Sequence, residues 1–136
     1  MSDAALKLRQ AIHSRLTADA ALLALLGGPR IHDEAPRAAT GPYVTFDSWQ
    51  ADDVSTPERR MTQHGFGLSI WAAQTSATAK NLAVAARIEG VLHDAAIAVE
   101  GHKLVFLYWQ SSASSRDERT KLPRLILSFK ALTETL

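Results

Sequence analysis

The sequence predicts an α+β fold in which an antiparallel or mixed β-sheet is flanked by two helical regions, in the order α-β-β-α-β-β. Apolar residues recur every three or four positions near the N-terminus and again in the middle of the chain, as in amphipathic helices. Four other segments are strand-like and lie between glycine, proline or polar runs. At 136 residues the chain has the length of one domain, so residues 1–136 are expected to form a single unit.

The N-terminal region is expected to form two helices. Ser2 can cap the first helix, and Thr17 is expected to cap a second, short helix over residues 18–26 that ends at Gly27. These helices present Leu and Ala rather than Arg, Asn and Gln, which argues against a DNA-recognition helix. The apolar face of the first helix is expected to consist of Ala5, Leu8, Ile12 and Leu16.

Two strands are predicted in the first half of the chain. Residues 42–50 alternate, with Val44 and Phe46 on one side, and residues 61–73 continue the same kind of pattern. A polar connection over residues 51–60 separates them. A short strand around Ile31 is also expected.

A second helix-and-strand group is predicted in the other half. A helix is expected from about Ser76, or Thr75, to about Ala95, followed by strands over residues 102–112 and 124–132, with a polar segment between them. The first of these strands is apolar on both sides, so we expect both of its faces to be buried. The buried stripe of the helix is expected to include Asn81, Val84, Ile88, Val91, Leu92 and Ala95.

The composition excludes several classes of function. The net charge is +1, which gives no electrostatic case for general binding to nucleic acid or to a membrane surface. The absence of cysteine excludes disulfides, thiolate zinc sites and cysteine nucleophiles. The N-terminus lacks the pattern of a signal peptide, and the apolar runs are too short to span a membrane.

Four potential ligands or proton carriers lie close together in the segment GVLHDAAIAVEGHKLVFLYW: His93, Asp94, Glu100 and His102. Adjacent helical residues point about 100° apart, so His93 and Asp94 do not naturally share a metal. We expect them to end the helix, with a turn at Gly101 leading into the next strand. A small hydrolase or metal enzyme using His93, Asp94 and His102 is kept as an alternative.

Other residues offer less support for catalysis. The segment IHDEAP (31–36) sets His32 beside two carboxylates and is expected to be a solvated loop. The sequence has neither a Gly-x-Ser-x-Gly elbow nor a phosphate-binding loop.

Two charged segments lie between predicted strands, at residues 57–60 and 116–121. Each mixes arginine with acidic residues, so each is either a solvated hairpin tip or a contact with a neighbouring protein. Tyr43 and Trp109 are candidate interface anchors or core residues. Trp49 and Trp71 are predicted at strand ends or opposite the core.

Several segments, taken together and in their order along the chain, resemble a known family from about Leu6 to Glu134, which is most of the chain. It is similar to the tail-completion or tail terminator proteins that join head and tail in long-tailed bacteriophages, prophages and gene transfer agents. No single motif in it is catalytic. The segments are LTADAALLALLGG, RIHDEAP, GPYVTF, SIWAAQTSATAKNLAVAARIEGVLHDA, GHKLVFLYWQSS and LSFKALTE.

The resemblance implies a structural virion protein and not an enzyme, with no cofactor and no metal. Such proteins form a ring, typically a hexamer, at the head-proximal end of the tail tube, where they stop tube growth. The implied partners are other copies of the chain, the tail tube protein, the head connector or stopper protein, and DNA that passes through the lumen without sequence-specific binding. Another head–tail connector component, such as a stopper, is the related alternative.

The family supplies no site residues, so the contacts are our own prediction. We expect the two charged segments to contact neighbouring subunits or the tube, and their arginines to face DNA in the lumen, where a few phosphate contacts suffice. The predicted interface residues are Glu58, Arg59, Arg60, Arg116, Asp117, Glu118 and Arg119, of which Arg59, Arg60, Arg116 and Arg119 are expected to face the lumen.

Overall fold

A computed structural model describes residues 2–32, 42–72, 78–119 and 121–136. The sheet has five strands in the order β1-β2-β3-β5-β4. β1 is parallel to β2, and the other neighbouring pairs are antiparallel. The predicted α+β class and mixed sheet are confirmed. The elements are α1 (Ser2–Thr17), α2 (Ala20–Leu26), β1 (Ile31–His32), β2 (Tyr43–Asp53), β3 (Met61–Trp71), α3 (Thr78–Leu92), β4 (His102–Arg116) and β5 (Pro123–Thr135).

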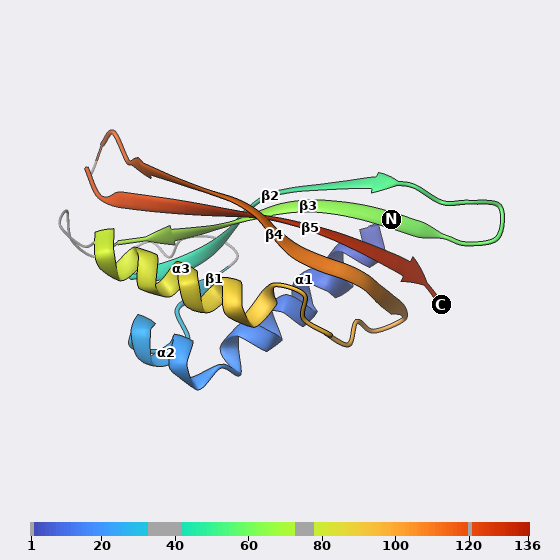
Figure 1. Ribbon diagram of the computed structural model, residues 1–136, viewed down its shortest axis with the longest axis horizontal. Helices are drawn as coiled ribbons and strands as arrows, with labels where there is room; N and C mark the ends of the chain where they lie inside the picture. The colour runs from blue at the N-terminus through green and yellow to red at the C-terminus, as the bar shows by residue number, and fades with distance from the viewer. Residues whose placement is uncertain (1, 33–41, 73–77, 120) are drawn as a thin grey trace.

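The helices cover one face of the sheet. Figure 1 shows that α1, α2 and α3 lie on the same face of the twisted sheet, and no helix of the described residues lies on the opposite face. We call this opposite surface the helix-free face. No helix among the described residues combines the length and apolar character needed to cross a membrane. The largest fully buried side chains between the two layers are Phe129, Leu8, Ile12, Leu16, Leu22, Leu26, Leu68, Ile70, Ile88, Leu92, Leu107 and Leu127.

The start of α2 differs from the prediction. Asp19, not Thr17, is the N-cap: its backbone is extended, and its side chain accepts a hydrogen bond of 2.9 Å from the backbone N–H of Leu22. Thr17 instead ends α1 and donates to the carbonyl of His13. Arg87 of α3 donates to both carboxylate oxygens of Asp19, and this hydrogen bonding lowers the pKa of Asp19.

The other helical predictions are mostly correct. Gly27 ends α2 in the left-handed conformation that favours glycine. In α1 the buried alanine is Ala4 rather than the predicted Ala5. α3 ends at Leu92, earlier than predicted, and Ala95 and Val91 are only partly buried. The side chain of Ser2 and the predicted caps Thr75 and Ser76 lie outside the part of the chain that is described.

β2, β4 and β5 are longer than predicted, and the polar connections are correspondingly shorter, whereas β3 ends at Trp71, before the predicted residue 73. β2 extends to Asp53 and β4 to Arg116, so the two hairpins project beyond the helical layer. The predicted burial of β4 on both faces is wrong. Bulges interrupt its pairing with β5, Val105 is 45% exposed, and Phe106 lies only partly buried on the helix-free face beside Tyr108.

Candidate assembly surfaces

The charged residues 57–60 lie at the tip of the β2–β3 hairpin. Thr56 and Arg59 exchange backbone hydrogen bonds of 2.9 and 3.3 Å, which close the turn. The guanidinium of Arg59 lies 3.8 Å from the Glu134 carboxylate, and the side chain remains 64% exposed. The N–H of Thr135 donates to the carbonyl of Arg60, which ties the C-terminal strand to this hairpin. We call residues 54–60 the β2–β3 tip.

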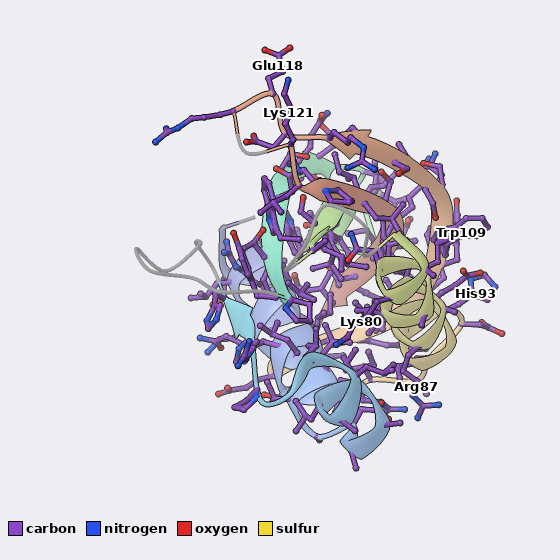
Figure 2. The ribbon with its side chains drawn as sticks, turned by 90° about the vertical axis from the view of Figure 1, so that its left-hand side faces the viewer. Lys80, Arg87, His93, Trp109, Glu118 and Lys121 are labelled. Atoms are coloured by element: carbon purple, nitrogen blue, oxygen red, sulfur yellow. The ribbon has the colours of Figure 1, made fainter. Side chains whose placement is uncertain are left out.

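The second charged segment forms the tip of the β4–β5 hairpin. The N–H of Lys121 donates to the carbonyl of Asp117 over 2.8 Å, and Arg116 donates to the carbonyl of Lys121 over 3.0 Å. Glu118 and Lys121 project away from the body of the molecule in Figure 2. We call residues 117–122 the β4–β5 tip.

The two tips lie at opposite ends of the sheet (Figure 1). β2 and β4 run in opposite directions, so β2 leads to one end of the sheet and β4 to the other. Glu58, Arg59 and Arg60 therefore lie at one end, and the predicted residues 116–119 lie at the other. The two groups are therefore separated by the length of the sheet.

A cluster on the helix-free face was not predicted as a unit. Arg124 of β5 stacks over the Trp71 ring at 4.7 Å and donates to the Asp47 carboxylate over 2.8 Å. Ser69, which is fully buried, donates to the same carboxylate and accepts from Arg124. Tyr43 stacks on Trp71 with ring centroids 6.1 Å apart. The alternation along β2, β3 and β5 already places these residues opposite the core, but it does not show that they meet.

The three tryptophans have different roles. Trp71 lies opposite the core, as predicted. Trp49 does not, because a bulge between Phe46 and Trp49 returns it to the core side, where it stacks on Phe66 at 4.5 Å. Trp109 also packs against the core, and its indole N–H donates to Ser112 over 3.0 Å.

His64 is completely buried next to Trp49. The indole N–H of Trp49 can only donate, so Nδ1 of His64 accepts it, at 3.2 Å. Nε2 of His64 therefore carries the proton and donates to the Thr133 hydroxyl over 2.9 Å. Burial, together with the nearby charge of His102, lowers the pKa of His64 to about 4. His64 is a neutral structural group, and sequence reasoning did not single it out.

The joint between α3 and β4 separates the residues first considered for catalysis. Nδ1 of His93 accepts the backbone N–H of Trp109 over 3.1 Å, and these two residues lie side by side in Figure 2. The N–H of Asp94 donates to the carbonyl of Leu107 over 2.8 Å, with Asp94 itself in the left-handed conformation. His93 and Asp94 thus directly follow the helix and attach it to β4. The predicted turn at Gly101, with a φ of 75°, is confirmed.

The other two members of this segment bind α1. Nε2 of the buried His102 lies 2.8 Å from the Asp3 carboxylate, and this hydrogen bond lowers the pKa of Asp3. Glu100 pairs with Lys7 over 3.4 Å. Within the described ranges, no three His, Cys, Asp or Glu side chains converge to hold a metal ion. Ile31 and His32 form β1, and residues 33–36 of the IHDEAP segment are outside those ranges.

The fold and its surfaces define a class of small α+β protein with its helices on one face of the sheet and a charged hairpin tip at each end of the sheet. Residues 10–134 match the family model described as tail completion protein gp17, and the chain belongs to this family. Its place is the virion tail. No curated protein matches the chain.

A solved structure extends the likeness to the whole fold. A chain from the structure titled "Virion of native gene transfer agent (GTA) particle" is 28% identical and superposes with a TM-score of 0.88. The match covers 96% of this chain and 97% of the other. The family and this likeness both indicate a structural virion component, which argues against an enzyme.

Proposed function

We propose that this chain forms a ring, typically of six copies, at the head-proximal end of a phage-like tail tube. The ring ends tube growth and joins the tail to the head connector. Residues 1–136 act in it as one domain. The observation that carries the proposal is the placement of the two charged tips at opposite ends of one rigid sheet. A subunit of this shape can present one tip to the tube and the other to the connector.

In this proposal the predicted interface residues contact neighbouring proteins in the assembled tail. Glu58, Arg59 and Arg60 contact one neighbour. The second group, which contacts another, consists of Arg116, Asp117, Glu118 and Arg119. Charged residues at exposed tips favour correct orientation and fast association more than tight binding. The arginines that face the lumen are Arg59, Arg60, Arg116 and Arg119, where a few phosphate contacts leave DNA free to pass.

Charge reversal at the tips is expected to separate the two joining steps. The variants are Arg59→Glu with Arg60→Glu at one end, and Arg116→Glu with Arg119→Glu at the other. Each pair opposes the native contacts by like-charge repulsion, so we expect head-joined particles to fall at least about tenfold. Electron microscopy with purified tails measures tube length and head joining separately.

The control carries the same change in net charge on the helical layer instead: Arg15→Glu in α1 with Lys80→Glu in α3, two exposed positions. We expect uncontrolled tube length from one tip variant and headless tails of normal length from the other. Normal particles from both tip variants would contradict the assignment. Location on the head side of the joint, rather than at the tube end, would identify a stopper.

A test of the enzymatic alternative uses the histidines of the α3–β4 joint. His93→Ala removes only an exposed acceptor, so we expect normal particle yield. His102→Ala removes a buried partner of Asp3 and is expected to lower the melting temperature while leaving tail joining intact below it. Particle counts and thermal unfolding distinguish these outcomes. Loss of joining in a folded His93→Ala protein would support a chemical role.

A further inference from the structure

The outer edge of β4 is open over only part of its length. β4 is the last strand of the sheet. Next to α3 its edge is closed, because Asp94 donates to the Leu107 carbonyl and Trp109 donates to His93. Beyond this point all side chains at 110–115 are exposed, and among the described residues no backbone group bonds to that part of the edge. Residues 110–115 contain no charge and no proline, the features that usually block strand pairing.

A second open edge lies on β2, at the other side of the sheet. β1 pairs with β2 only at Val44 and Thr45. Within the described residues, nothing pairs with the outer edge of β2 over residues 48–53. Each open edge contains a run of six residues, 110–115 in β4 and 48–53 in β2, and these runs lie toward opposite ends of the molecule (Figure 1).

We propose that residues 110–115 of one subunit pair with residues 48–53 of the next copy, so that the sheet continues from subunit to subunit. This inference rests on the proposed ring. Strand direction fits, because β2 and β4 are antiparallel within one sheet and neighbouring copies in a ring keep the same orientation. The contact is head-to-tail, the type that closes into rings, whereas pairing of β4 with another β4 would stop at two copies.

The pleat of the sheet fixes which registers are allowed. Ala113 is on the helix-free face through its pairing with Ile126, and Gln50 is on the same face through Gly65. Ser112 and Ala51 are both on the helix side. A continuous sheet must match these faces. The register that overlaps all six residues places Ala113 opposite Gln50, Ser112 opposite Ala51, and Ser111 opposite Asp52.

This register avoids facing charges. Asp52 and Asp53 are opposite Ser111 and Gln110, whose hydroxyl and amide groups can donate hydrogen bonds to carboxylates. Like charges directly across a strand pair would be destabilising, and here none occur.

The same register gives the strand tilt that a closed sheet requires. Within one chain, Ala113 pairs with Ile126 of β5, which in turn pairs with Ser69 of β3. Gln50 of β2 pairs with Gly65 of β3. Ser69 and Gly65 are four residues apart along β3. Each subunit is therefore staggered by about 14 Å along the strands over four strand spacings, or about 19 Å across the sheet. These values give a tilt of roughly 36°, within the range of about 35–45° for closed barrels.

Cysteine cross-linking tests the pairing directly, since the natural chain contains no cysteine. The variant Gln50→Cys with Ala113→Cys places both thiols on one face and opposite each other. Mixed with purified tails and oxidised, it should give a ladder of covalent multimers on a non-reducing gel, ending at the ring size. The matched control, Gln50→Cys with Ser114→Cys, sets the thiols on opposite faces and should cross-link at least about tenfold less.

Each outcome bears on a different claim. Tube-end rings in the microscope without a ladder would overturn the edge pairing and leave the proposed function intact. Dimers from Ala113→Cys alone would indicate β4–β4 pairing, and a product containing the tube protein would indicate a different occupant; both overturn the inference. If the unmodified chain never joins a tube, the proposed function fails and the inference fails with it.

Discussion

Phe66→Ala is expected to lower the free energy of unfolding by about 3–5 kcal/mol, the range for removing a large aromatic side chain from a core. Phe66 is 3% exposed and lies between two parallel rings: Trp49 at 4.5 Å and Phe129 at 5.5 Å. Its loss leaves a cavity and ends both stacks. Because a domain of this size is stabilised by only about 5–15 kcal/mol, chemical denaturation should show a large shift in midpoint.

The matched control is Phe106→Ala on the helix-free face. Phe106 also stacks on an aromatic ring, that of Tyr108 at 5.3 Å, but it is only partly buried. Its side chain buries less apolar surface in the folded state. We therefore expect its removal to lower the free energy of unfolding of the isolated chain by about 1 kcal/mol. Equal losses for the two variants would show that the helix side of the sheet is not the main core.

Acidification from pH 6.5 to pH 4 is expected to destabilise the protein through His64. The pKa of this histidine is lowered from 6.5 to about 4 in the folded state, so the unfolded chain binds the extra proton between these values. Stability from His64 is therefore fully present above pH 6.5 and is lost progressively as the pH falls from 6.5 to about 4. A shift of this size corresponds to about 3 kcal/mol.

The comparison variant is His64→Gln, which cannot titrate in this range. We expect its unfolding free energy to be lower at pH 7 and to change much less between pH 6.5 and pH 4. The pKa values of Asp3, Asp19 and Asp53 are lowered, so their contributions are lost at still lower pH and remain separable. Identical pH profiles for the two proteins, measured by denaturant titration, would refute a buried neutral His64.

Local pattern predicted the helices well and the strand lengths less well. The three-and-four spacing of Leu8, Ile12 and Leu16 identified the buried side of α1, because each residue's face follows from helix geometry alone. Asp19 was missed as a cap because Thr17 is an equally acceptable residue by type. Arg87, 68 positions away, donates hydrogen bonds to the Asp19 carboxylate. A contact at that separation has no local sequence signal.

The bulges account for the errors in β2 and β4. Strict alternation carries Trp49 to the side of the sheet opposite Phe66, and one extra residue at the bulge brings the two rings together. In β4 a similar irregularity between Leu104 and Phe106 changes which side chains face the helices. No residue in either segment marks the insertion, since glycine is absent from both bulges.

The sequence by itself determined the α+β class, the positions of the helices and most strands, and the resemblance to tail completion proteins. Each of these depends on periodicity or on the order of segments along the chain. Only the tertiary structure decided that the two charged segments lie at opposite ends of the sheet and that β2 and β4 are its edge strands over residues 48–53 and 110–115. It also brought Arg124 to Asp47 and buried His64 beside Trp49. Such contacts depend on strand order and register, which long-range pairing sets and local sequence does not encode.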